Sequence, residues 1–121
     1  MNETKLVREI QGKLSKDEVR LFRNNCGKLQ DKNGTWVAYG LCPGSSDLIG
    51  WREVLITSEM VGKTVAQFVA LEVKSNSGRP TPEQIAFLLT VMKSGGLSSL
   101  VFSLEEARQV LNIPDDKATV P

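Results

Sequence analysis

The sequence predicts an α/β fold in which a mixed central β-sheet is flanked by helices. One observation is the order of the expected elements, which runs helix, several strands, helix, strand, helix. The other is an apolar strand-helix-strand unit over residues 64–102. The length of 121 residues fits one compact domain. We therefore expect a single domain over residues 1–113 and a loose tail over residues 114–121.

The first half is expected to hold a surface helix followed by strands. Between residues 3 and 14, apolar side chains recur at helical spacing. A short alternating strand is predicted over residues 19–22, before a run of turn-forming residues. A turn signal at residues 31–34 precedes a strand over residues 36–39, which predicts a hairpin. A loop over residues 41–47 then leads into a strand that begins near Asp47.

The second half is expected to hold the centre of the sheet. Residues 64–74 predict a long strand that is apolar on both faces and therefore central. Thr81 and Pro82 provide an N-cap and a first helical position, and Gly95 ends that helix. Its core-facing stripe is predicted to be Ile85, Leu88, Leu89 and Met92. Residues 98–102 favour a strand, and a last short helix, capped by Ser103 and ended by Pro114, is expected through Leu111.

Composition excludes several classes of function. The absence of histidine excludes nucleophilic sites that need an imidazole base and zinc sites that need imidazole ligands. Cys26 and Cys42 are too few for an all-thiolate zinc site or a disulfide framework, so we expect free cytosolic thiols. No segment approaches the roughly 20 apolar residues that span a bilayer. We expect a cytoplasmic protein with no membrane partner, and the net charge of +1 confines any polyanion site to a local patch.

Glu72 and Lys74 are the first residues that indicate chemistry. Side chains two apart in a strand project from one face, so both stand together in an otherwise apolar segment. An isolated Glu-x-Lys is a structural ion pair or a solvated pair in about nine cases in ten. Asp47 changes this weighting, because it starts one strand while Glu-x-Lys ends the next. Two converging carboxylates can hold a hard divalent cation, and a neighbouring ammonium suits phosphodiester hydrolysis.

Four motifs in this order resemble one family. They are Gly44-Ser45-Ser46-Asp47-Leu48-Ile49-Gly50, Leu71-Glu72-Val73-Lys74-Ser75, Gly78-Arg79-Pro80-Thr81-Pro82-Glu83-Gln84 and Gly95-Gly96. Together they are similar to the VRR-NUC (virus-type replication-repair nuclease) domain of the PD-(D/E)XK nuclease superfamily, in its stand-alone phage or bacterial form. The resemblance spans the first helix to about Ser103 and implies a restriction-endonuclease-like core.

The resemblance also implies roles for individual residues. Asp47 and Glu72 match the metal-binding carboxylates, with the main-chain carbonyl of Val73 as a further ligand. Lys74 matches the catalytic lysine, and Gln84 matches a glutamine beside the active site. Glu3 falls where the family has an acidic residue near the metal. The catalytic set is therefore expected to be Asp47, Glu72, Lys74 and Gln84, and the metal ligands Asp47, Glu72, Val73 and Glu3.

Several of these residues also have structural explanations. Gln84 can complete a capping box with Thr81, and this role is compatible with a catalytic one. Glu3 can also be a solvated first-turn glutamate that the helix dipole stabilises, and this explanation is about as strong as a role at the metal. Ser46 and Arg79 could contact phosphate, but Ser46 can also simply cap a turn and Arg79 can simply be solvated. The candidates for DNA-backbone contact lie in residues 1–40, which hold eight Lys or Arg against five Asp or Glu. They are Lys5, Arg8, Lys13, Lys16, Arg20 and Arg23.

The resemblance implies a Mg²⁺- or Mn²⁺-dependent endonuclease that leaves a 5′-phosphate. Stand-alone members of the family resemble small junction resolvases, so we expect a homodimer that prefers branched DNA, above all Holliday junctions and then flaps. A four-way junction has two symmetric scissile sites, which a two-fold dimer matches. The rival prediction is a catalytically silent DNA-binding or assembly module in which Glu72 and Lys74 are merely ion-paired. A sequence-specific restriction enzyme is disfavoured because the chain is too short for base-reading elements.

Overall fold

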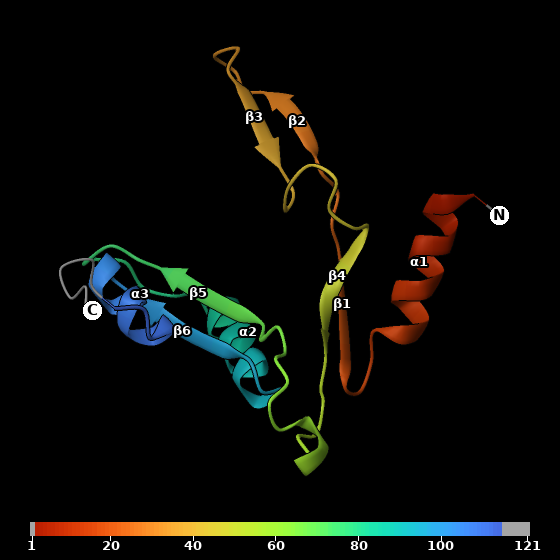
Figure 1. Ribbon diagram of the computed structural model, residues 1–121. Helices are drawn as coiled ribbons and strands as arrows, with labels where there is room; N and C mark the ends of the chain where they lie inside the picture. The colour runs from red at the N-terminus through yellow and green to blue at the C-terminus, as the bar shows by residue number, and fades with distance from the viewer. Residues whose placement is uncertain (1, 115–121) are drawn as a thin grey trace. The chain divides into compact units, whose positions relative to one another are not determined.

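A computed structural model of the protein describes residues 2–114 and gives a mixed α/β structure (Figure 1). It contains three α-helices, one short 3₁₀ helix over Ser58–Met60 and six strands within these residues. The chain divides into two compact units, Met1–Leu55 and Ile56–Pro121. The strands pair as three two-stranded sheets in the described part. The predicted mixture of helices and strands is confirmed.

Unit 1 begins with helix α1 (Glu3–Leu14), as predicted from its apolar spacing. Asn2 caps it, because its Oδ1 accepts a hydrogen bond from Lys5 N at 2.7 Å. Ser15 ends the helix, and Leu21 N donates to its Oγ at 2.8 Å. The Gln11 side chain donates to Leu21 O at 3.1 Å. These two bonds attach α1 to the strand that follows it.

That strand, β1 (Val19–Arg23), pairs antiparallel with β4 (Leu48–Arg52) in unit 1. The register places Arg23 opposite Leu48, and Asn24 N donates to Asp47 O at 2.8 Å one position further on. Pairing therefore extends to Asp47, and the prediction of a strand beginning near this residue is confirmed. Phe22 and Trp51 contact each other across the pair, with ring centroids 5.5 Å apart.

The predicted hairpin is formed by β2 (Gly27–Gln30) and β3 (Trp36–Tyr39). Asp31 fixes its turn, since Oδ1 accepts hydrogen bonds from Asn33 N at 2.8 Å and Thr35 N at 2.9 Å. The φ of +82° at Gly34 favours glycine there. The sequence analysis found the turn and β3 but assigned no strand to residues 27–30.

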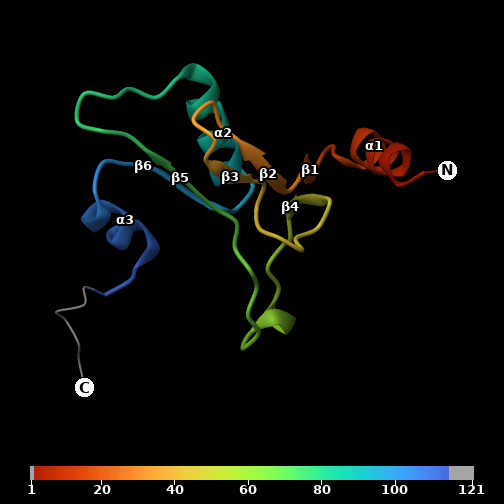
Figure 2. The same cartoon turned by 90° about the horizontal axis from the view of Figure 1, so that it is seen from above.

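Unit 2 is built on β5 (Val69–Val73), α2 (Pro82–Lys93) and β6 (Leu97–Val101). The two strands run parallel with α2 packed against both (Figure 2). The predicted strand over residues 64–74 was too long, because β5 starts only at Val69. Its ladder begins opposite Leu97, the first residue after the Gly95-Gly96 turn, and Leu97 N donates to Phe68 O at 2.8 Å. Because β6 starts at Leu97, it has no residue that could pair with residues 64–67.

The core-facing stripe predicted for α2 was wrong in most of its members. Ile85, Leu89 and Met92 are 44%, 45% and 54% exposed, whereas Val91 is 1% exposed. A pair of strands spans little more than the width of one helix, so only a narrow face of α2 can be covered by it. The start of α2 is as predicted, with Thr81 at the N-cap and a complete capping box with Gln84. Gly95 follows its end with a φ of +99°.

Helix α3 (Leu104–Leu111) ends the described structure. Ser103 caps it as predicted, accepting a hydrogen bond from Glu106 N at 3.1 Å. The helix runs through Leu111 as predicted, and Asn112 rather than the expected Pro114 ends it, in a left-handed conformation with a φ of 56°. Residues 115–121 of the predicted tail lie outside the described residues. No helix within residues 2–114 is long and apolar enough to cross a membrane.

The N-cap of α2 gives a test of how much local capping stabilises unit 2. Thr81→Ala should lower the free energy of unfolding by about 1 kcal/mol, because it removes the side-chain hydroxyl that accepts a hydrogen bond from Gln84 N at the helix start. Urea unfolding followed by circular dichroism measures it. Thr90→Ala is the matched control, since Thr90 lies in the helix interior, where alanine is the better helix former. Equal losses in both variants would contradict the capping role.

Candidate functional site

Glu72 and Lys74 form an ion pair at the end of β5. Lys74 Nζ lies 3.4 Å from Glu72 Oε2, and the two side chains are only 21% and 27% exposed. Lys74 follows the last residue of the strand, but its N–H still donates to Val101 O at 3.0 Å. The sheet ladder therefore fixes the backbone beneath both charges. The predicted ion pair is present, and it keeps an ammonium and a carboxylate side by side.

Both charged side chains lie on the α2 face of the β5–β6 sheet. Ser98 Oγ donates to Leu88 O at 2.7 Å, which places Ser98 on the face that α2 covers. Ser98 is paired with Ala70, and Leu100 with Glu72. Because alternate residues share a face, Glu72 lies on the same side as Ser98, and Lys74 follows on that side.

Gln84 lies in the first turn of α2, which begins at the end of unit 2 where β5 stops. Its Oε1 accepts a hydrogen bond from Thr81 N at 2.9 Å, and Gln84 N donates to Thr81 Oγ1 at 3.1 Å. The capping box anticipated from the sequence is thus complete. The Nε2 amide group of Gln84 has no protein acceptor within the described residues. This amide group is therefore available as a donor for a further role.

The loop between β5 and α2 brings Gly78 against Lys74. Gly78 N donates to Ser75 O at 2.8 Å, and a side chain at this glycine would meet Lys74 Cβ at 3.3 Å. A larger residue would therefore push on the lysine stem. Arg79 follows on the exposed surface of the same loop.

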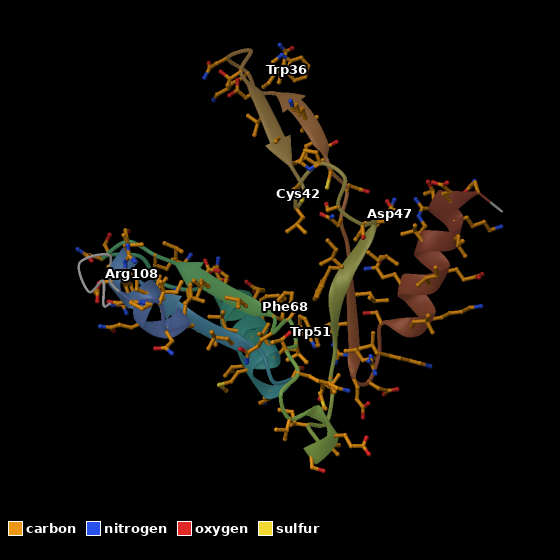
Figure 3. All side chains as sticks on the ribbon, viewed as in Figure 1. Trp36, Cys42, Asp47, Trp51, Phe68 and Arg108 are labelled. Atoms are coloured by element: carbon orange, nitrogen blue, oxygen red, sulfur yellow. The ribbon has the colours of Figure 1, made fainter. Side chains whose placement is uncertain are left out.

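Asp47 belongs to unit 1, where it is exposed at the junction of a loop and β4 (Figure 3). Its carbonyl accepts the hydrogen bond from Asn24 described above. Its side chain forms no hydrogen bond or ion pair within the described residues. A polar pocket of about 430 Å³ lies beside it. The residues that line this pocket are Asn24, Asn25, Cys26, Tyr39, Ser45 and Asp47.

The ionisation of Cys26 in this pocket is perturbed by its neighbours. A hydrogen bond with Ser45, at an Oγ to Sγ distance of 3.1 Å, lowers the pKa of the thiol below its ordinary value. Desolvation opposes this shift, while the N–H groups of Cys42 and Leu41 and the Asn24 side chain favour the thiolate. Cys26 and Cys42 are both exposed free thiols, as expected.

The remaining predicted ligands lie in different units. Glu3 is exposed in the first turn of α1, and Val73 is the last residue of β5. The structure thus brings Glu72 and Lys74 together in unit 2, with Gln84 at the same end, and places Asp47 and Glu3 in unit 1. Within residues 2–114, no three Asp, Glu or Cys side chains form a group that could hold a metal ion.

The sequence analysis missed the polar cluster around Asn24. Residues 23–27 were assigned only to turn formation, although Asn24 continues the pairing of β1 with β4 by one residue. The available signal was an asparagine directly after a strand, which has too many ordinary explanations to identify a partner loop 17 to 22 residues further along the chain.

Comparison with known protein families gives one result. The family model described as "VRR-NUC domain" matches residues 3–103, which cover most of both units. The comparisons with curated proteins and with solved structures gave no match. The family match includes all four motifs on which the resemblance was based.

The perturbed thiol predicts a pH dependence. Because the pKa of Cys26 is lowered, its thiolate forms at a lower pH than that of an ordinary cysteine, and alkylation should accelerate correspondingly early as the pH rises. The measurement is the rate of iodoacetamide modification against pH in Cys42→Ser protein. Adding Ser45→Ala should move the midpoint to higher pH, because the largest stabilising hydrogen bond is lost. An unchanged midpoint would show that Ser45 does not stabilise the thiolate.

Proposed function

The chain belongs to the VRR-NUC domain family, a family of nucleases, and we propose that it is a divalent-metal-dependent endonuclease that hydrolyses phosphodiester bonds in branched DNA. The observation that carries this proposal is the Glu72–Lys74 pair. A carboxylate and an ammonium lie 3.4 Å apart, largely shielded from solvent, at the end of a strand. Such a pair is costly to desolvate, and it provides two groups that phosphodiester hydrolysis needs.

The proposed ligands fit a hard cation. Asp47, Glu72 and Glu3 offer carboxylate oxygens, Val73 offers a main-chain carbonyl, and the chain has no histidine to add a softer donor. All-oxygen sets of this kind suit Mg²⁺ and Mn²⁺. When bound, the cation supplies positive charge at the scissile phosphate and acidifies water.

The protein's own groups have distinct parts in the proposed reaction. Lys74 orients the attacking water, or offsets the negative charge that develops on phosphorus during in-line attack. The 3′ oxygen leaves, and the product carries a 5′-phosphate. Gln84 helps to fix the water or Lys74 through its Nε2 group, because its Oε1 is bonded to Thr81 N. Glu72 holds both the cation and the ammonium in place.

The proposed site needs residues from both units. We assign the chain a PD-(D/E)XK-like core with a mixed central sheet, as a single domain over residues 1–113, in which Asp47 and Glu72 are both metal ligands. The parallel pairing of β5 with β6 around α2 supports this, because a strand-helix-strand unit of this kind is a usual building block of sheets flanked by helices. The low burial of the apolar residues supports it as well, since only Val91 and Val101 are fully buried among the described residues.

The proposed substrate is a four-way junction, with flaps as the second choice, and the active form is a homodimer with paired active sites. The proposed setting is the cytoplasm of a bacterial host, with the protein encoded by the host or by a phage. A catalytically silent DNA-binding module is the alternative. It predicts binding to DNA without a divalent cation and no cleavage.

Removing either the proposed ligand Asp47 or the ammonium of Lys74 should abolish cleavage. Asp47→Ala and Lys74→Ala should each lower the cleavage rate of a labelled four-way junction in Mg²⁺ by at least about 100-fold, because each removes charge stabilisation at the reacting phosphate. Glu83→Gln is the control, since Glu83 is an exposed acid next to Gln84 with no proposed role. Circular dichroism checks that each variant is folded. Retained cutting by either alanine variant would refute the assignment.

The assembly is tested independently of the chemistry. Light scattering should give twice the mass of the 13.3 kDa chain, and junctions should be cut faster than linear duplex of the same sequence, because two active sites can engage two symmetric strands. A monomer that cuts linear duplex equally well would overturn the dimer and the substrate preference, and would leave the roles of Asp47 and Lys74 intact.

A further inference from the structure

Asn24 is bonded to nearly the whole length of the loop that leads to Asp47. Its Nδ2 donates to Ser45 Oγ at 2.7 Å and to Ser46 O at 2.9 Å. Its Oδ1 accepts from Leu41 N at 2.9 Å, and its own N–H donates to Asp47 O at 2.8 Å. One side chain therefore uses both amide hydrogens and its carbonyl oxygen on a single loop.

Ser45 closes the same loop from within. Its hydroxyl lies 2.6 Å from Cys42 O and 3.1 Å from Cys26 Sγ and can donate its one hydrogen to either, while its backbone N–H donates to the Cys42 carbonyl at 3.0 Å. Cys42 N donates to Ser45 Oγ at 3.3 Å. The loop is thus a closed turn, and the Asn24 amide joins this turn to the end of β1.

The Asp47 carboxylate has no contact of its own that would fix it. Its side chain is exposed and has no hydrogen-bond or ion-pair partner within residues 2–114. Its position is therefore set by the backbone on either side, which is β4 after it and the loop before it. On the loop side, the backbone is held by Asn24. A metal ligand must be held to within about 0.5 Å, so the residue that fixes its backbone affects its affinity.

From this geometry we infer that Asn24 is a positioning residue, which holds the 41–47 loop so that the Asp47 carboxylate is presented to the divalent cation. This inference rests on the proposed function, because it takes Asp47 to be a ligand. Asparagine suits the role chemically. Aspartate would lose both donor bonds to the loop, and alanine would lose all three side-chain bonds.

Removing the Asn24 side chain should weaken cation binding while leaving the fold intact. Residues that orient a ligand typically change metal affinity by about 10- to 100-fold. Asn24→Ala should therefore raise the Kd for Mg²⁺ alone by about 10-fold or more. The measurement is a Mg²⁺ titration of the full-length protein, followed through the backbone amide NMR signals of residues 46–48. A higher Mg²⁺ concentration should then restore the cleavage of junction DNA.

Two further variants make the test specific. Asn33→Ala is the matched control, because Asn33 lies in the hairpin turn of the same unit and its side chain has no hydrogen bond within the described residues. Ser45→Ala should have a smaller effect in the same direction. The double variant with Asn24→Ala should show less than the sum of the two free-energy effects, because both act on one loop. Ser45→Ala also replaces Asn24→Ala in the titration if the latter fails to fold.

The outcomes distinguish a failure of the Asn24 positioning role from a failure of the proposed function. If Asn24→Ala or its substitute binds Mg²⁺ with the wild-type Kd, the positioning role is overturned while the proposed function stands. If the wild-type protein shows neither Mg²⁺-dependent shifts at residues 46–48 nor cleavage, the proposed function is overturned and the positioning role with it. A raised Kd with an unchanged thermal midpoint supports both.

Discussion

The proposed chemistry of this protein depends on one ion pair held at the end of an apolar strand. Glu72 and Lys74 are each about three-quarters buried, and their charged atoms lie 3.4 Å apart. Pairing offsets only part of the cost of removing two charges from water, and apolar residues of similar size often stabilise such positions equally well. Stability alone therefore gives a weak reason for this pair, whereas hydrolysis of a charged phosphodiester gives a strong one. The pair is also placed by sheet geometry, since alternation puts both side chains on the α2 face.

The elements that the sequence predicted best are those with signals contained in a few neighbouring residues. Glu3 to Leu14 has an apolar stripe, and the run from Thr81 to Gln84 contains a complete capping box, so both helices begin where expected. The strand over residues 64–74 was overestimated because a strand's length depends on its partner. β6 emerges from a glycine turn at Leu97, and this long-range event limits the ladder on β5. The exposed stripe of α2 has the same origin, because the width of the sheet beneath a helix is not a local property.

The residues of the candidate site also differ in whether their positions follow from local spacing or from distant parts of the chain. Glu72 and Lys74 could be paired from sequence alone, because a spacing of two in a strand is itself a geometric statement. The capping role of Gln84 was predicted and is confirmed by the hydrogen bond from Thr81 N to its Oε1, whereas its catalytic role stays a prediction. The contacts of Asn24 could not be predicted, since its partners lie in a loop that its own neighbours do not specify. Asp47 belongs to unit 1 and Glu72 to unit 2, so a shared metal site for the two carboxylates stays a prediction.

Near-neutral charge makes the Glu72–Lys74 pair more informative about mechanism. A chain with a net charge of +1 has little general attraction for DNA, so positive charge must be available locally. While Glu72 is paired only with Lys74, the ammonium is largely neutralised by its neighbour. Under the proposed function, Glu72 shares its carboxylate between Lys74 and a divalent cation, which leaves more of the lysine's charge for a phosphate. The ion pair would then hold Lys74 in position before the substrate arrives. This reconciles the structural reading of the pair with the catalytic one, because a single contact serves both.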